Sequence, residues 1–212
     1  VYKRQLVHVS NAASFGFFNV QKKCFETDWL NKIRMDTIRL PEICEDMEVL
    51  GMYKDIPVTV AIGDNQASFL GAAGSENNTL LVNMGTGGQI SVLTDQYFET
   101  EGIEARPFLG GKYLLVGASL CGGKAYALLE NFFRSFMKEA TGQDIPLYEI
   151  LGRLAEKGMD ASSSSMKVQT TFDGTRTDSG LRGEIRNISS DNFTPEFLTY
   201  GVLEGMIREL YD

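Results

Sequence analysis

Glycines punctuate the stretch 79–123, and they constrain the order in which secondary structure can form there. Residues 79–83 and 89–93 are apolar runs typical of strands, and Gly85-Thr86-Gly87-Gly88 lies between them. Glycine adopts backbone conformations that other residues avoid, so the spacing predicts a β-hairpin with a glycine-rich tip.

A third strand and a helix are expected directly after this hairpin. Residues 112–120 form the strand, Gly122-Gly123 ends it, and 124–139 has the periodicity of an amphipathic helix. Its expected apolar side consists of Leu128, Leu129, Phe132, Phe133 and Phe136. A further strand ends at Gly63, before a helix over 64–74. Mixed strands and helices predict the α/β or α+β class.

The composition is that of a globular protein without a basic binding face. The 212 residues include 20 Lys+Arg and 28 Asp+Glu, a net charge of −8, which disfavours nucleic acid and membrane surfaces as partners. Three cysteines without C-x-x-C spacing indicate neither a disulfide framework nor a zinc site, and fit a reducing cytoplasm.

The hairpin tip is the first candidate binding feature. Its glycines let the backbone approach an anion, Thr86 adds a hydroxyl, and successive N–H groups can form a donor nest for a phosphate. An ordinary glycine turn has the same residues. Gly122 and Gly123 also allow two interpretations: a helix start that holds a phosphate or nucleoside, or close packing of a helix on a sheet.

Asp64 is the candidate general base. It follows a predicted strand, at the edge where α/β proteins gather their ligands. Aspartate is also among the best helix caps and could simply accept hydrogen bonds from the N–H groups of residues 65–67. The residues alone leave both interpretations open.

Other notable side chains are expected to have structural roles. His8, the only histidine, lies on a predicted strand without the Ser or Cys partner of a triad, and we expect it to be packed or partly exposed. Cys121 is expected to be a small buried thiol. Two groups of phenylalanines are expected in the core rather than as stacking platforms: Phe15, Phe17 and Phe18, and Phe132, Phe133 and Phe136.

Four ordered blocks of sequence carry a family resemblance. They are SNAASFG at 10–16, GDNQASFLG at 63–71, NMGTGGQIS at 83–91 and GASLCGGKA at 117–125. With these blocks the chain resembles the FGGY family of carbohydrate kinases, above all its sedoheptulokinases. The later segment DGTRTDSGLRG at 173–183 is similar to the sugar-kinase segment that precedes a helix, so the resemblance extends over essentially the whole chain.

The resemblance implies an α/β fold with two actin-like, ribonuclease-H-like domains, incomplete in this chain. Residues 1–74 would be the C-terminal part of the sugar-binding N-terminal domain, and 75–212 the first part of the nucleotide-binding C-terminal domain. The family's amino-terminal D-x-G-T-T hairpin and carboxy-terminal glycine-rich adenine loop have no counterpart in the sequence. We therefore expect a fragment that lacks about half of a kinase.

Roles for individual residues also come from the resemblance. Asp64 matches the catalytic base, which takes a proton from the sugar hydroxyl. Asn65 and Gln89 would lie near the sugar. The expected contacts to ATP are Gly85, Thr86 and Gly87 at the phosphates, and Gly122 and Gly123 beside the nucleotide. No residue is assigned as a metal ligand, although ATP and Mg²⁺ are the implied cofactors.

The implied function is ATP-dependent phosphorylation of a primary hydroxyl of a ketose, sedoheptulose or a similar sugar, in the cytoplasm. The fragment itself is expected to be inactive. A small sugar is the implied binding partner, and a second copy of the chain, in a homodimer, is the protein partner considered. Two alternatives stay open: an actin-like nucleotide-binding or regulatory protein, and an interaction module that self-associates through exposed apolar surface.

Overall fold

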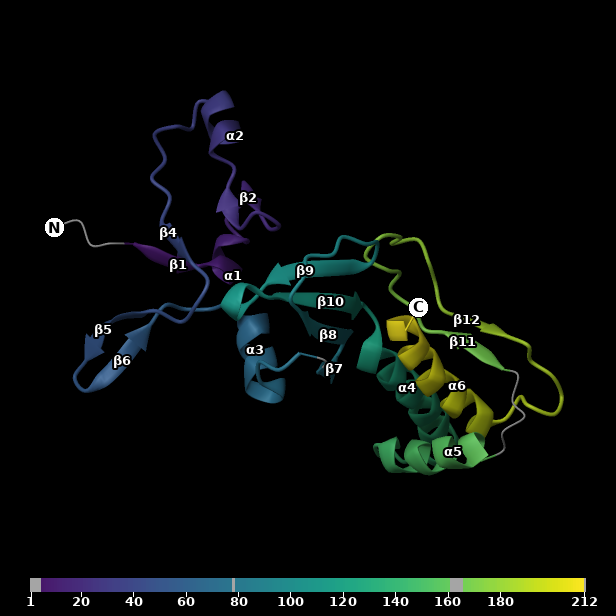
Figure 1. Ribbon diagram of the computed structural model, residues 1–212. Helices are drawn as coiled ribbons and strands as arrows, with labels where there is room; N and C mark the ends of the chain where they lie inside the picture. Colours follow the sequence, from purple (N-terminus) through teal and green to yellow (C-terminus); the bar gives the residue numbers. More distant parts are fainter. Residues whose placement is uncertain (1–4, 78, 161–165, 212) are drawn as a thin grey trace. The chain divides into compact units, whose positions relative to one another are not determined.

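The computed structural model describes residues 5–77, 79–160 and 166–211 (Figure 1). The chain forms two compact units, which are described separately. Unit 1 is Val1–Leu81 with Ser91–Val116, and unit 2 is Val82–Ile90 with Gly117–Asp212. The predicted boundary after residue 74 concerns the sugar-binding and nucleotide-binding domains of the family, and it stays a prediction.

Strands and helices are mixed, as the sequence predicted. The helices are α1 (Val9–Ala12), α2 (Thr27–Lys32), α3 (Asp64–Ala73), α4 (Gly122–Thr141), α5 (Tyr148–Asp160) and α6 (Pro195–Tyr211), with a 3₁₀ turn η1 (Leu109–Gly111). The strands are β1 (Leu6–His8), β2 (Phe18–Asn19), β3 (Cys24–Phe25), β4 (Glu42–Cys44), β5 (Val49–Tyr53), β6 (Ile56–Thr59), β7 (Leu80–Met84), β8 (Gly88–Thr94), β9 (Ile103–Pro107), β10 (Tyr113–Ser119), β11 (Lys167–Gln169) and β12 (Glu184–Arg186).

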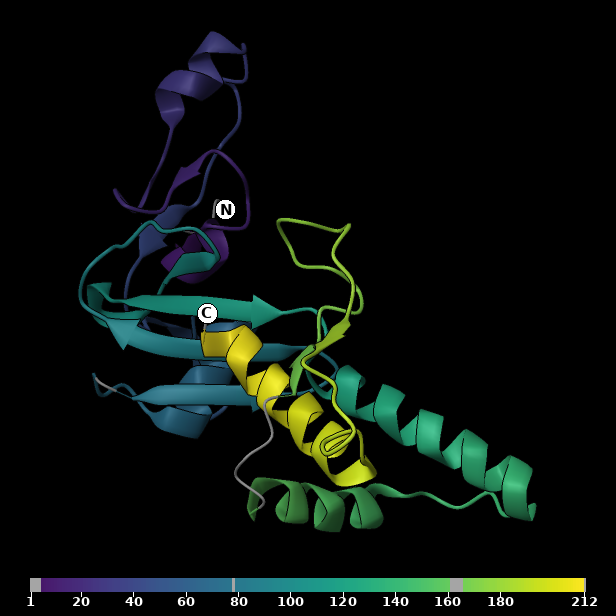
Figure 2. The same cartoon turned by 90° about the vertical axis from the view of Figure 1, so that its right-hand side faces the viewer.

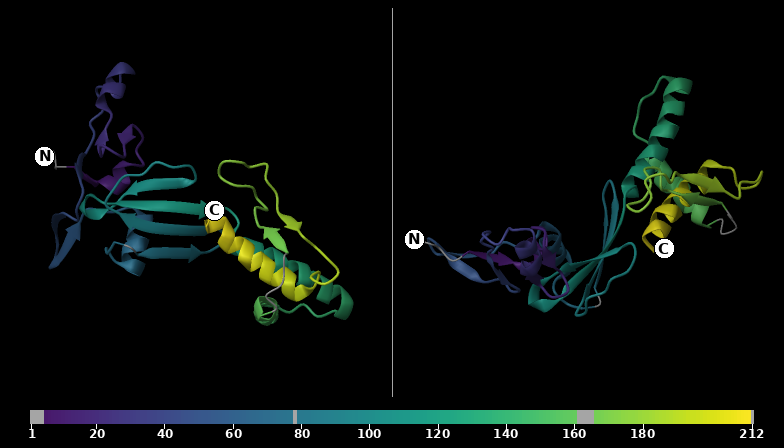
Figure 3. Two further views of the ribbon diagram at one scale, coloured as in Figure 1. Left: turned by 45° about the vertical axis from the view of Figure 1, so that its right-hand side comes forward. Right: turned by 90° about the horizontal axis from the view of Figure 1, so that it is seen from above.

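The predicted hairpin and third strand belong to a four-stranded sheet with the order β7-β8-β10-β9, visible as adjacent ribbons in Figure 3. Strands β7, β8 and β10 contribute residues to both units, and β9 lies in unit 1. Elsewhere in unit 1, β1 pairs in parallel with β4, and β5 pairs with β6 in an antiparallel hairpin.

The core of unit 1 joins α3 to the sheet. Phe69, on α3, is fully buried and its ring packs edge-on against that of Phe108, with 5.8 Å between the ring centroids. The cluster is completed by Leu93, Leu114 and Val116. Burial of side chains of this size stabilises a fold by about 1.5–3 kcal/mol each, which fixes α3 on the sheet.

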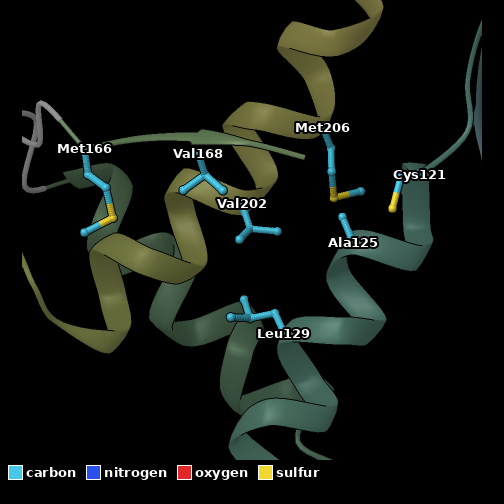
Figure 4. Close-up of a cluster of buried hydrophobic side chains, with 7 residues drawn as sticks. All are labelled: Cys121, Ala125, Leu129, Met166, Val168, Val202 and Met206. Carbon is cyan, nitrogen blue, oxygen red and sulfur yellow. The ribbon is translucent and has the colours of Figure 1, made fainter. Parts of the chain in front are cut away.

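The core of unit 2 lies between α4, α6 and the segment of β11 (Figure 4). Cys121 is the N-cap residue of α4, Ala125 and Leu129 lie on α4, and Val202 and Met206 face them from α6. Met166 and Val168 complete the cluster. Helix α6 also packs on α5 (Figure 2). The prediction that Cys121 is a buried thiol is confirmed.

The prediction that both phenylalanine groups are core is wrong for four of the six residues. On α4 the buried stripe is Ala125, Leu129 and half-buried Phe133, spaced four residues apart. Leu128, Phe132 and Phe136 repeat the same spacing one position earlier and face solvent, with Phe136 73% exposed. Phe15 and Phe17 are also exposed, although the ring of Phe15 stacks on that of Phe25.

The buried carboxylate of Glu130 fixes the start of α5. Only 2% of this residue is exposed, and its Oε1 atom accepts a hydrogen bond of 3.0 Å from the Leu147 N–H group. The Leu147 carbonyl in turn accepts from Leu151, in the first turn of α5. Glu130 therefore orders the connection between α4 and α5.

We predict that Glu130→Ala lowers the free energy of unfolding by about 1–3 kcal/mol, because it leaves the buried Leu147 N–H group without its acceptor. Glu130→Gln keeps an acceptor oxygen and should cost less. Urea denaturation measures both. Glu139→Ala, which removes an exposed carboxylate from the same helix, is the control and should stay within about 0.5 kcal/mol of the original. Equal losses for Glu130→Ala and Glu139→Ala would contradict the role of Glu130.

Candidate functional site

Asp64 is the first residue of α3 and is exposed. The N-cap position belongs to Gly63, which has an extended backbone and no side chain with which to cap the helix. The Asp64 carboxylate accepts one hydrogen bond, 2.7 Å long, from the N–H group of Asn65. Asp64 thus caps the N–H group of Asn65, one of the three that the capping interpretation considered. Its carboxylate is nevertheless exposed at the surface.

A cavity of about 530 Å³ lies in unit 1 beside this helix start. Its lining comes from the α1 segment, from Gly63–Gln66 and from the end of β9. The structure therefore brings the predicted residues Asp64 and Asn65 to one cavity. A volume of this size falls in the range of small-molecule sites.

Asn65, which lines the cavity, has a buried side-chain oxygen. Its side-chain Oδ1 is buried, and no hydrogen-bond partner for it occurs among the described residues. A buried acceptor without a partner costs free energy, so it is expected to be satisfied by a water or a ligand.

Glu104 and Arg106 also line the cavity, and sequence reasoning missed them. Their side chains form an ion pair of 2.7 Å on β9. The signal was present in the sequence, because residues two apart on a strand project from the same face. Nothing in the sequence indicated, however, that this face meets the start of α3.

The hairpin tip lies in unit 2 and consists of Gly85, Thr86 and Gly87. It contacts the start of α4. The N–H group of Gly123 donates to the carbonyl of Gly85 over 2.8 Å, and that of Lys124 donates to Thr86 over 3.0 Å. These two N–H groups of the first helical turn are therefore engaged by the hairpin. A phosphate at this place would meet the tip, where Gly85 and Thr86 are exposed, rather than these donors.

Gly122 and Gly123 allow the helix to approach the hairpin this closely. A Cβ atom on Gly122 would lie 2.5 Å from the Gly87 carbonyl carbon, and one on Gly123 would lie 2.5 Å from the Gly85 oxygen. The close-packing interpretation of the glycine pair is therefore confirmed. Its predicted role beside a nucleotide stays a prediction, as does the role of Gln89, a half-buried residue of β8.

Lys124 links the helix start to the segment after β11. Its ammonium group forms an ion pair of 2.6 Å with Asp173, and this hydrogen bond raises the pKa of Lys124. The neighbouring thiol of Cys121 has a raised pKa, first because it is buried and also because Asp173 is near. The thiol is therefore held in its unreactive protonated form.

The described residues contain no cluster of three or more His, Cys, Asp or Glu side chains that could hold a metal ion. Among the same residues, no helix is both long enough and apolar enough to span a membrane.

Sugar kinases of known structure share the fold of this chain. Xylulose kinase from Bifidobacterium adolescentis superposes with a TM-score of 0.77 at 18% identity, over 98% of this chain and 44% of that one. Glycerol kinase of Plasmodium falciparum, solved with ADP, gives 0.69 at 20% identity, over 97% and 42%. The chain thus has part of the two-domain fold of carbohydrate kinases, as the resemblance implied.

Curated proteins similar to the chain in sequence include sedoheptulokinases and a glycerol kinase. Human sedoheptulokinase is 25% identical over 223 aligned residues, which cover 98% of this chain and 46% of the human protein. The mouse sedoheptulokinase matches equally. No family model matches the chain. The predicted resemblance to FGGY carbohydrate kinases is confirmed, and the chain spans about half the length of the sedoheptulokinases that it matches.

We predict that Gly123→Ala destabilises unit 2 by about 1–3 kcal/mol, because the added Cβ atom would press on the Gly85 carbonyl. Urea denaturation again measures the change. Gly152→Ala is the matched control: Gly152 lies in α5 with open space around its Cβ position, so alanine there should stabilise by about 0.4–1 kcal/mol. A Gly123→Ala protein as stable as Gly152→Ala would show that the contact with the hairpin tip is absent.

Proposed function

We propose that these residues belong to an ATP- and Mg²⁺-dependent kinase that phosphorylates a primary hydroxyl of a ketose, sedoheptulose or a similar sugar. The observation that carries the proposal is the cavity beside Asp64, in a chain with a sugar-kinase fold and sedoheptulokinase similarity. An exposed carboxylate and an amide residue at the cavity wall suit a ligand that is rich in hydroxyl groups.

Asp64 is the proposed general base. An exposed carboxylate at the wall of a cavity can accept the proton of a bound sugar hydroxyl as that hydroxyl becomes a nucleophile. Asn65, at the same cavity, would orient the sugar. Gln89 is proposed as a further substrate contact. The contribution of these residues is mainly positioning, which is the chief source of rate in phosphoryl transfer.

ATP would be held at the hairpin tip. The exposed Thr86 hydroxyl, between Gly85 and Gly87, suits phosphate oxygens. The start of α4 at Gly122 and Gly123 supports this tip through the hydrogen bond from the Gly123 N–H group to the Gly85 carbonyl. When bound, ATP with its Mg²⁺ supplies the phosphoryl group and neutralises its charge. The metal is proposed to enter with the nucleotide, since no residue of this chain is assigned to it.

Two alternatives differ in what they require of Asp64. An actin-like nucleotide-binding or regulatory protein would keep the hairpin tip and lose nothing if Asp64 were replaced. An interaction module would need neither feature. The partner proposed here is a small sugar, the proposed location is the cytoplasm, and the homodimer stays a prediction for size-exclusion chromatography with light scattering.

We predict that Asp64→Asn lowers kcat by about 10²–10⁴-fold in a polypeptide that contains these residues and transfers phosphate, because the general base is lost. Nucleotide affinity should stay within about twofold, since the proposed phosphate contacts are Gly85, Thr86 and Gly87 and do not include Asp64. A coupled ADP-release assay and nucleotide titration measure the two effects. Asp55→Asn, on the exposed turn between β5 and β6, is the control. Unchanged turnover in Asp64→Asn would remove Asp64 from the mechanism and favour the regulatory alternative.

We also predict that the 212-residue chain by itself is inactive or binds nucleotide only weakly, because it corresponds to 46% of the relatives' length. The same coupled assay with ATP and sedoheptulose tests this. Turnover at rates ordinary for kinases, on the order of 1–100 s⁻¹, would refute it.

A further inference from the structure

We propose that Ser10, oriented by His8, is a positioning residue that fixes the backbone from which Asp64 projects. The inference rests on the proposed role of Asp64 as general base. It adds His8 and Ser10, which have no part in the proposed function. Both belong to unit 1, as Asp64 does.

His8 lies at the end of β1, where it is fully buried. Its Nε2 atom lies 3.2 Å from the carbonyl oxygen of Glu45, which can only accept a hydrogen bond, so Nε2 carries the proton. Burial lowers the pKa of His8, against the opposing charges of Glu45 and Asp46, and favours the neutral ring. In that tautomer Nδ1 is an acceptor.

Ser10 connects this ring to the loop before α3. Its hydroxyl oxygen lies 2.7 Å from His8 Nδ1 and donates its hydrogen there, and its N–H group approaches the same nitrogen at 3.2 Å. The hydroxyl oxygen also accepts a hydrogen bond of 2.9 Å from the N–H group of Gly63. The Ser10 hydroxyl therefore has both its proton and a lone pair in use, and its orientation is determined.

Gly63 is the residue immediately before Asp64, and both its N–H group and its carbonyl group are hydrogen-bonded. Its N–H group donates to Ser10, and its carbonyl accepts the hydrogen bond from Ala67 that begins α3. A Cβ atom at Gly63 would lie 2.4 Å from Gln66 Oε1. The side chain of Gln66 is itself buried and donates to the Pro107 carbonyl over 3.0 Å.

These contacts leave the Asp64 Cα atom little freedom, although its carboxylate is exposed. Proton transfer from a bound hydroxyl requires the base within hydrogen-bond reach, and errors near 1 Å are costly in rate. The buried chain from the Glu45 carbonyl through His8 and Ser10 to Gly63 therefore supplies the rigidity that an exposed residue at a helix start lacks.

The test compares Ser10→Ala, which removes the hydroxyl, with Ser10→Thr, which retains it. Ser68→Ala, at an exposed position of α3, is the control. In the 212-residue chain, NMR measures hydrogen exchange of the Gly63 amide and ¹⁵N order parameters of Asp64 and Asn65. We expect Gly63 exchange to rise at least tenfold in Ser10→Ala and the order parameters to fall from about 0.85 towards 0.6, with Ser10→Thr and Ser68→Ala close to the original.

A second measurement uses a polypeptide that contains these residues and transfers phosphate. There Ser10→Ala should lower kcat at least tenfold and leave the KM for ATP within twofold, and Ser10→Thr should restore kcat. Unchanged Gly63 exchange, unchanged order parameters, or unchanged kcat in Ser10→Ala would overturn the inference. If no ketose is phosphorylated, the proposed function fails by itself, while the NMR measurements still show whether Ser10 orders Asp64.

Discussion

The contact between the backbone of the hairpin tip and the first turn of α4 determines much of unit 2. Two N–H groups of α4 are satisfied by hairpin carbonyls, and side chains are excluded from the contact because even a methyl group would collide with the facing backbone. The position of α4 then places Ala125 and Leu129 against α6, so the core of the unit is built on this junction. The same junction leaves Thr86 exposed at the tip.

In unit 1 the start of a helix is also held in place by hydrogen bonds, but here buried side chains make them. Asp64 is the first residue of α3, and the first N–H groups of a helix have no acceptor within the helix. The loop that leads to Gly63 therefore needs hydrogen bonds from elsewhere to stay ordered. Ser10 from α1 and Gln66 from α3 each make one directed hydrogen bond to a different backbone segment. Both are buried, and buried hydrogen bonds of this kind are costly to break.

The parts of this structure that the sequence could predict are those with a local cause. Glycine spacing predicted the hairpin of β7 and β8, the strand β10 and the start of α4 to within a few residues, since turn and helix-start chemistry depends on neighbours in the chain. The exposed stripe of Leu128, Phe132 and Phe136 could not be predicted in this way, because two adjacent stripes of one helix have the same periodicity. Which stripe is buried depends on where α6 packs.

In the candidate site, too, the sequence predicted the local features but not the contacts between distant residues. The motif around Asp64 is local, and sequence alone placed Asp64 and Asn65 at a helix start. The polar groups that surround them are joined by contacts between residues 41 to 53 positions apart, from Ser10 to Gly63 and from Gln66 to Pro107. No local pattern encodes such pairs. His8 illustrates the consequence: with no triad partner it looks like a packing residue, and only the path through Ser10 to Gly63 connects it with the acid that it is proposed to support.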